Sequence, residues 1–413
     1  MSDRTKFQAP RGTHDVLPGD DLWWHLVRTM EQIAVDYGWG RIQTPGFEDT
    51  ALFARTAGEA SDVVHKEMYT FTDRSNRSLT LRPEGTAPIC RAYVEHGMDR
   101  LPQPVKMFTI APMYRYGRPG RGRYREHYQW SVEAIGSADP ALDAEIVQLY
   151  HELLRRLGVT QWELRLNSIG DPNCRPAYVE RLNEWLDAHA DLLDEDARHK
   201  RATSPLQVFD VKNPELRKAL EDAPKVGESL CDACREHFDA VRRHLDLYGV
   251  PYAVDPTLVR GLDYYSRTTF EFVGPEENVN STICGGGRYD GLIEQIGGPP
   301  TPGIGFGAGL ERLILALENE GIAATPRAID VFFVVDGAPR ERILEAMAEL
   351  RRAGVSADAD YAGRSVKGQM TQAGRSGART IVVAREDNAA IRRGRDDEHV
   401  VALDQLVATL RPS

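Results

Sequence analysis

The alternation of polar and apolar residues is clearest along residues 127–135, which form a predicted strand. One face of this strand carries Gln129, Ser131 and Glu133, and the other face carries larger apolar side chains. The strand lies within residues 108–136, where an apolar run stands on each side of a centre rich in arginine, glycine and proline. This pattern predicts a hairpin of two strands joined by a long loop.

Helical spacing of apolar residues predicts several helices elsewhere in the chain. They cover residues 20–37, 86–94, 141–157 and 310–317. Residues 171–249 are charged, helical in pattern and poor in strand signals, which favours a helical insertion. From residue 326 onward, strands alternate with helices, as is typical of a small three-layer α/β domain. We therefore predict two domains, residues 1–325 and residues 326–413, with the insertion inside the first.

Composition restricts the class of protein and its partners. Of the 413 residues, 41% are hydrophobic and 27% are charged, as in soluble globular proteins, and no apolar run is long enough to span a membrane. Five cysteines, an odd number, do not indicate a disulfide scaffold, so we predict a cytoplasmic location. The net charge of −11 argues against nonspecific binding of nucleic acid. A nucleic-acid partner would have to be recognised by shape and by local basic patches.

The loop of the predicted hairpin holds five arginines, whose planar guanidinium groups match phosphate oxygens. They are Arg115, Arg118, Arg121, Arg123 and Arg125. With the carboxylate of Glu133 on the adjoining strand, this loop suits a ligand that is anionic at one end and cationic at the other. The alternative is a solvated basic hairpin, because exposed charges contribute little.

Three other stretches place polar groups where a ligand could bind. Glu84 and Thr86 stand at a predicted strand-to-helix corner, although Thr86 could simply cap the helix. Arg260 stands unpaired in a glycine turn beside Tyr264 and Tyr265, a set suited to a flat polar ligand or to packing. Residues 284–291 contain three consecutive glycines that allow close backbone approach, but they could equally form a loop.

Four glycines alternate along residues 303–309, so a strand there would have a flat floor on one face. Arg312 follows on a predicted helix, off its apolar stripe. A purine held between this floor and Arg312 is one interpretation, and close packing of helix on strand is the other.

Cys231-x-x-Cys234, with His237 nearby, is the one sequence pattern that suggests a metal. Zinc needs a fourth ligand, usually from a second pair, and we find none in sequence range. We therefore expect no structural metal in the protein, and interpret the pair as two ordinary thiols at the start of a helix.

Taken together, these stretches closely resemble the histidyl-tRNA synthetases, which are class II aminoacyl-tRNA synthetases. Residues 38–53, 108–136 and 303–317 resemble the three class II motifs, and residues 82–86, 260–265 and 285–291 resemble signatures of the histidine enzyme. The resemblance implies an α+β fold, with an antiparallel sheet surrounded by helices, a helical insertion and a C-terminal α/β anticodon-binding domain. It also implies a homodimer formed through the first motif.

The implied reaction joins L-histidine to ATP as histidyl-adenylate and then transfers the histidyl group to the 3′ end of tRNA(His). The resemblance assigns catalysis to Arg115 and Arg260, which would meet at the α-phosphate, where the family uses an arginine in place of a metal ion. It assigns ATP binding to Arg115, Arg123 and Arg312, with Mg²⁺ bridging the outer phosphates. The implied histidine-binding residues are Glu84, Thr86, Arg115, Gln129, Glu133, Arg260, Tyr264 and Tyr265, with Glu133 and Tyr265 at the imidazole.

Two departures from the family pattern concern Gly117, where an acidic residue is more frequent, and Trp130-Ser131, which replaces a less bulky pair. Gly117 puts contacts of the loop with the tRNA in question, whereas Trp130 should face away from the ligand. Two other functions are to be weighed. One is a non-catalytic regulatory subunit of ATP phosphoribosyltransferase, which typically lacks the C-terminal domain and loses the Arg260 signature. The other is an RNA-binding module without chemistry, against which Glu84, Arg115, Arg260 and Arg312 together argue.

Overall fold

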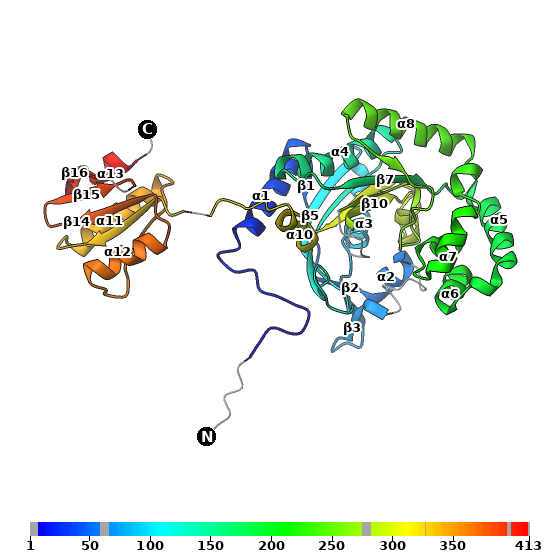
Figure 1. Ribbon diagram of the computed structural model, residues 1–413, viewed down its shortest axis with the longest axis horizontal. Helices are drawn as coiled ribbons and strands as arrows, with labels where there is room; N and C mark the ends of the chain where they lie inside the picture. The colour runs from blue at the N-terminus through cyan, green and yellow to red at the C-terminus, as the bar shows by residue number, and fades with distance from the viewer. Residues whose placement is uncertain (1–6, 58–65, 275–281, 327, 395–397, 412–413) are drawn as a thin grey trace, which may run out of the picture. The chain divides into compact units, whose positions relative to one another are not determined.

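The protein divides into two compact units, Met1–Ala324 and Thr325–Ser413 (Figure 1). The computed structural model describes residues 7–57, 66–274, 282–326, 328–394 and 398–411. In those residues, every helix is too short or too polar to cross a membrane.

The first unit is built on an eight-stranded sheet. Across the sheet the strands run β1 (Gly40–Arg41), β5 (Val105–Tyr114), β6 (Glu126–Ile135), β11 (Gly303–Gly309), β10 (Thr282–Arg288), β9 (Ser266–Val273), β7 (Glu163–Ser168) and β8 (Ala253–Val254). Neighbouring strands are antiparallel except β1 with β5 and β7 with β8, which pair parallel. The antiparallel sheet and the β5–β6 hairpin confirm the fold that the sequence predicted.

One face of this sheet is covered by the apolar sides of amphipathic helices. They are α1 (Asp21–Asp36), α4 (Pro140–Leu157), α8 (Asp232–Tyr248) and α10 (Leu310–Asn319). Trp130 and Phe306 point from β6 and β11 into this core, with their ring centroids 5.3 Å apart. Helix α4 begins where the side chain of Asp139 accepts a hydrogen bond from the amide of Ala141, and it ends at Gly158 in the left-handed conformation. Trp130 therefore faces away from the opposite, polar face of β6, as its strand phase predicted.

The opposite face of the sheet carries smaller elements. They are α3 (Thr86–Glu95), α9 (Leu292–Gln295), the 3₁₀ helix η2 (Met98–Arg100), and a three-stranded sheet of β2 (Phe47–Asp49), β4 (Ser78–Leu81) and β3 (Tyr69–Thr72) with α2 (Thr50–Ala57). A second apolar cluster, which includes Ile89, Tyr93 and Leu292, joins α3 and α9 to the helices inserted after β7. The polar side chains of β6 consequently point into a space walled by elements from distant parts of the chain.

Between β7 and β8 the chain forms only helices and turns. They are α5 (Arg175–Ala188), α6 (Glu195–Thr203), α7 (Pro214–Ala219), α8, and the 3₁₀ helices η3 (Ala190–Leu192), η4 (Pro205–Asp210), η5 (Leu220–Asp222) and η6 (Val226–Ser229). Figure 1 shows α5, α6 and α7 grouped at the end of the unit beyond β7.

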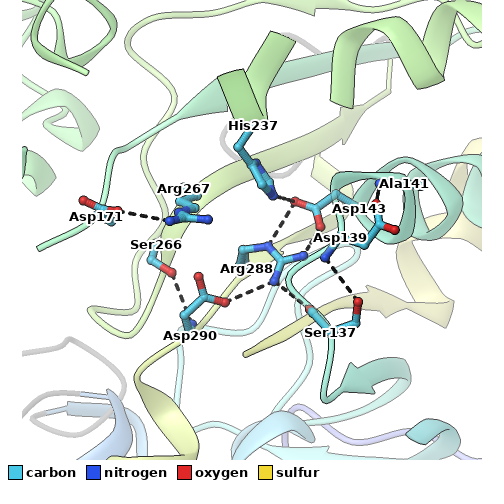
Figure 2. A network of polar contacts seen from close by, with 10 residues as sticks. All are labelled: Ser137, Asp139, Ala141, Asp143, Asp171, His237, Ser266, Arg267, Arg288 and Asp290. Atoms are coloured by element: carbon cyan, nitrogen blue, oxygen red, sulfur yellow. Dashed lines mark hydrogen bonds and ion pairs between the residues drawn. The ribbon is translucent and has the colours of Figure 1, made fainter. Parts of the chain in front are cut away.

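A largely buried ion network joins β10 to α4 (Figure 2). Arg288, at the end of β10, pairs with Asp143 of α4, and both side chains have no exposed surface. The same guanidinium donates to the carbonyl of Ser137 (2.9 Å) and to Asp290 (3.1 Å). Since Tyr289 follows Arg288 directly, the network fixes the position of that tyrosine as well.

The second unit is a five-stranded sheet between helices. The strand order is β13 (Ala357–Ala359), β12 (Val331–Val335), β14 (Thr380–Ala384), β15 (Asn388–Arg392) and β16 (Glu398–Ala402). Alternate residues of β12 enter two separate apolar clusters. Helices α11 (Arg340–Arg352) and α13 (Leu406–Leu410), the latter preceded by η7 (Leu403–Gln405), pack on one face, and α12 (Val366–Arg375) packs on the other. These are the three layers that the strand and helix alternation predicted.

Candidate active site

A cavity of about 360 Å³ lies over the polar face of β6, β11 and β10. It gathers residues that are distant in sequence, from the β5–β6 hairpin, the corner before α3, the turn before β9 and the start of α10. All but one of the predicted site residues line it. Those that do are Glu84, Thr86, Arg115, Arg123, Gln129, Arg260, Tyr264, Tyr265 and Arg312; Glu133 is the exception.

Part of the cavity wall is strongly cationic. Arg115, Arg123, Arg260 and Arg312 all line it. Burial lowers the pKa of Arg312, and the positive charges of the other three lower it further. His127, which also lines the cavity, has its pKa lowered to about 3 by burial and by two of these arginines, so it is neutral. Such a concentration of positive charge in a half-enclosed site suits a polyphosphate.

Backbone carbonyls hold two of these arginines and a carboxylate holds a third. Arg115 donates through Nε to the carbonyl of Pro83 (2.7 Å). Arg312 donates through Nη1 to Thr282 (2.9 Å) and through Nε to Gly122 (3.2 Å). Arg123 pairs with Glu67 at 2.6 Å. Each guanidinium has five N–H donors, so these contacts orient the groups and leave donors for a ligand.

Arg260 is not unpaired, which corrects the expectation from the sequence. It forms an ion pair with Glu271, which lies on β9. The partner could not be identified from the turn alone because β9 returns beside it only in the folded sheet. Gly285, opposite Glu271 on β10, makes room for this arrangement, because a Cβ atom there would collide with the guanidinium of Arg260.

Glu84 caps the first turn of α3. Its carboxylate accepts hydrogen bonds from the backbone amides of Thr86 (2.6 Å) and Ala87 (2.8 Å), so it satisfies donors that have no partner within the helix. The N-cap residue is Gly85, and the suggestion that Thr86 caps the helix is wrong. Burial is the main effect on the Glu84 carboxyl and raises its pKa.

Glu133 lies one layer below the cavity and is completely buried. Its carboxylate accepts hydrogen bonds from the hydroxyls of Thr86 (2.6 Å) and Tyr289 (2.5 Å). Burial raises its pKa to about 8, and the charge of Glu84 adds to this, against the opposing effect of the two hydroxyls. Among the described residues its partners are these hydroxyls, with no arginine. Tyr289 was part of a recognised motif, but the sequence did not show that its hydroxyl reaches this carboxylate.

The glycine floor of β11 is mostly covered by the chain's own side chains. A Cβ atom at Gly303 would meet the ring of Tyr289, one at Gly305 the carboxylate of Glu133, and one at Gly307 the amide of Gln129. Gly309 faces open space and lines the cavity together with Gly307. The strand prediction is therefore confirmed, and the three glycines of 285–287 also lie in a strand, β10, which settles the alternative of a loop.

Two tyrosines and a carboxylate complete the wall. The rings of Tyr264 and Tyr265 lie 4.7 Å apart, and Tyr264 meets the ring of Tyr289 edge to face at 5.9 Å. Glu311 accepts a hydrogen bond from the amide of Tyr128 (2.8 Å), and its second carboxylate oxygen is buried without a partner among the described residues. Burial raises its pKa to about 7. The sequence analysis did not single out Glu311, which is adjacent to Arg312.

Comparisons with known sequences identify one family. The family model of the histidyl-tRNA synthetases matches residues 12–313. A histidine–tRNA ligase of Nocardia farcinica is 48% identical over 420 residues, covering 100% of this chain and 99% of the relative. Another, of Desulforamulus reducens, is 46% identical over 381 residues, covering 92% of this chain and 91% of the relative.

Solved structures show the same relationship. Apo histidyl-tRNA synthetase of S. aureus is 35% identical and has a TM-score of 0.83; the match covers 98% of this chain and 100% of that protein. An ATP phosphoribosyltransferase regulatory subunit/histidyl-tRNA synthetase of Bacillus halodurans has a TM-score of 0.65, covering 92% of this chain and 98% of that protein. At 21% identity it demonstrates a shared fold alone. Because the family model and near-half-identical relatives both cover most of its length, the chain belongs to the histidyl-tRNA synthetase family.

Proposed function

We propose that the protein is a histidine–tRNA ligase, which activates L-histidine with ATP and transfers it to tRNA(His). The observation that carries this proposal is one cavity that combines four arginines with Glu84, Gln129 and two tyrosines. Adenylate formation needs both sets, because ATP brings negative charge and the amino acid brings a cationic amino group. The family membership of the chain supports the same reaction.

In the first step, the carboxylate of histidine attacks the α-phosphorus of ATP, and pyrophosphate leaves. Negative charge accumulates on the α-phosphate oxygens, where preplaced guanidinium donors stabilise the transition state. We assign this role to Arg115 and Arg260. Glu271 holds the guanidinium of Arg260 in place before ATP arrives, so little reorganisation is needed when the charge develops.

Arg123 and Arg312 are assigned to the outer phosphates and the adenine of ATP. Burial and repulsion by the neighbouring arginines disfavour the charged guanidinium of Arg312 when no ligand is bound. Binding of an anion offsets this repulsion. Mg²⁺, when bound with ATP, would neutralise charge on the outer phosphates. Glu311 and Glu67 are two carboxylates of the cavity whose oxygen atoms suit that ion, and one oxygen of Glu311 has no partner within the described part of the chain.

The polar face of β6 and the corner before α3 are assigned to histidine. Glu84, Thr86 and Gln129 would hold the amino group, and Tyr264 would pack beside them. Glu133 and Tyr265 would read the two imidazole nitrogens. In this arrangement the ring N–H replaces the hydroxyl of Thr86 as a donor to Glu133, which frees that hydroxyl for the amino group.

The second unit is proposed to bind the anticodon, whose unpaired bases can be recognised by side chains. A homodimer is proposed through the first class II motif, because β1 is an edge strand of the large sheet. Nearby, Phe47 of β2 and Phe71 of β3 are 50% and 43% exposed, with ring centroids 6.1 Å apart. An exposed aromatic pair beside open strand edges favours an interface. The cytoplasmic location stays a prediction from the cysteine content.

Histidine-dependent exchange between ATP and pyrophosphate tests the proposal, with the nineteen other amino acids as controls. We expect exchange with histidine alone, followed by charging of tRNA(His). A regulatory paralogue or an RNA-binding module would bind ligands without any exchange, and that result would overturn the proposed activity. Light scattering in solution tests the dimer separately.

A further inference from the structure

Four side chains outside the active site form a compact cluster of metal-ligand type: Asp171, Cys174, Cys231 and Cys234. One ligand atom from each lies within 4.8 Å of all the others. Asp171 and Cys174 follow β7 at the start of α5, and the two other cysteines stand at the start of α8. All except Cys231 are buried, and Cys231 is half-buried.

From the sequence we found no second ligand pair in range of Cys231 and Cys234, but the fold brings one beside them. Asp171-x-x-Cys174 is that pair, and it was missed because Cys174 and Cys234 are 60 positions apart. Their sulfur atoms lie 3.9 Å apart in the folded protein. Two thiolates on one tetrahedral zinc ion, with Zn–S bonds of about 2.3 Å, lie about 3.8 Å apart, whereas a disulfide needs about 2.05 Å. Cys174 and Cys234 therefore have the separation that a shared metal requires.

The surroundings suit a site with excess negative charge. Three thiolates and one carboxylate around Zn²⁺ leave a net charge of −2, which needs compensation. Arg267 offsets one of these two charges, since its guanidinium lies 3.3 Å from Oδ2 of Asp171. The backbone amide of Asp171 points at the sulfur of Cys174 (3.4 Å), and the amide of Asn173 donates to Oδ1 of Asp171 (2.9 Å). These contacts orient the ligand atoms as outer contacts do in metal sites.

His237 is not a member of this cluster, although the sequence places it close to Cys234. Its Nε2 atom lies 3.6 Å from Asp143, in the buried ion network (Figure 2). The fourth ligand is thus a carboxylate oxygen, a group that zinc accepts beside thiolates.

We propose that Asp171, Cys174, Cys231 and Cys234 bind one Zn²⁺ ion as a structural site. Four protein ligands leave no position for a reacting water, which distinguishes the site from a catalytic one. The ion would join the beginning of α5, the first of the inserted helices, to the beginning of α8, the last of them.

This tie also reaches the active site, a consequence that rests on the proposed function. Arg267, which contacts Asp171 (Figure 2), is the second residue of β9 and follows Tyr265 by two positions. Arg175, next to Cys174, donates to the carbonyl of Tyr265 at 2.8 Å. The zinc site therefore acts as a positioning element for the turn that carries Arg260, Tyr264 and Tyr265.

Metal analysis of the intact, untagged protein tests the proposal without any reference to activity. We expect about one zinc per chain after growth in zinc-supplemented medium. After removal of zinc with a chelator under reducing conditions, one equivalent of Co²⁺ should produce thiolate charge-transfer bands and the intense visible bands of a tetrahedral ion. A protein that carries no zinc and gives no such cobalt spectrum would overturn the site, and iron in its place would overturn the choice of zinc.

Variants with a matched control locate the ligands. Cys174→Ser and Cys231→Ser should each lower zinc to well below half an equivalent, whereas Cys90→Ala, which removes another buried thiol, should leave it unchanged. Asp171→Cys should retain the full equivalent and strengthen thiolate absorption. If the serine variants keep zinc, the assignment fails. If the serine variants do not fold, the cobalt spectra of the unaltered protein and of Asp171→Cys still show whether these residues bind the metal ion.

The effect on the active site has its own readout. In zinc-depleted, folded protein, the KM for histidine in pyrophosphate exchange should rise several-fold, with little change in the KM for ATP, and added zinc should restore it. If the unaltered protein binds zinc but shows no exchange with histidine at all, the proposed function fails and the metal site stands. Equal KM values with and without zinc would overturn the positioning role.

Discussion

Glu133→Gln is the substitution that most directly tests how the site chooses histidine. It keeps the shape of the side chain but removes its ability to ionise. In the folded protein the carboxyl has a pKa of about 8 and no exposed surface, with Thr86 and Tyr289 as its partners. At pH 7 about one molecule in ten of the unliganded protein is therefore ionised there.

The raised pKa makes a prediction about stability. Since burial raises the pKa from its ordinary 4.5 to about 8, the folded protein holds this proton more tightly than the unfolded chain. The associated stability is fully present below about pH 4.5 and is lost as the pH rises through about 8. The difference between these two pKa values corresponds to a contribution of at most about 5 kcal/mol to the free energy of unfolding.

Denaturant unfolding of the unaltered protein and of Glu133→Gln between pH 5 and pH 9, without ligands, measures this effect. We expect the unaltered protein to lose stability relative to the variant as the pH rises, because all other titrating groups are common to both. Glu163→Gln on β7, an exposed carboxylate, is the matched control and should follow the unaltered protein. Parallel curves for the unaltered protein and Glu133→Gln would contradict the raised pKa.

Histidine binding provides the second measurement. An ionised Glu133 can accept the ring N–H, and loss of a hydrogen bond to a charged group costs about 1.5–3 kcal/mol, or a 10- to 150-fold loss of affinity. We expect the KM for histidine in pyrophosphate exchange to rise by this factor in Glu133→Gln, with little change for ATP. If ATP binding suffers equally and the selectivity for histidine survives, the carboxylate is structural and the specificity assignment is wrong.

The remaining predictions concern three other parts of the molecule. Arg260→Ala should lower the rate of pyrophosphate exchange by a factor of about 10²–10³, because a donor to the developing charge is lost. The surface variant Arg165→Ala should retain normal exchange, and near-normal exchange in Arg260→Ala would refute the catalytic role of Arg260. A chain ending at residue 324 should still perform the exchange but charge tRNA(His) poorly in an aminoacylation assay; equal charging by both chains would assign the second unit another task. Arg288→Leu should lower the free energy of unfolding, measured with denaturant, by about 3–5 kcal/mol, because Asp143 is left buried without this arginine. The double variant Arg288→Leu with Asp143→Leu should recover part of this loss, and no recovery would contradict the reasoning.

Local patterns in the sequence predict the faces of strands well and the partners of side chains poorly. The alternation in β6 predicted correctly that Gln129 and Glu133 share one face, because strand geometry has a period of two residues. The same alternation carries no information about Thr86 and Tyr289, which come from a helix and from the end of another strand. Their approach depends on the packing of α3 and β10 against β6.

The metal-ligand cluster and the second unit illustrate the same limit. Cys231 and Cys234 are visible as a motif, whereas Cys174 joins them only through the fold of the inserted helices. In the second unit, β15 (Asn388–Arg392) was not predicted, because two alanines and a short length give no clear alternation. Its strand conformation comes from pairing with β14 and β16 on both sides.

The strand glycines beneath Glu133 and Gln129 limit how the specificity of this cavity can change. Under these two side chains there is only peptide, since Gly305 and Gly307 leave no further side-chain atoms to remove. Space for a bulkier amino acid on this side of the cavity can therefore be made only by removing the polar groups that are proposed to recognise histidine. Redesign for a larger substrate, by a protein engineer or by natural divergence, has to widen the side walls at Leu262, Tyr264 and Tyr265.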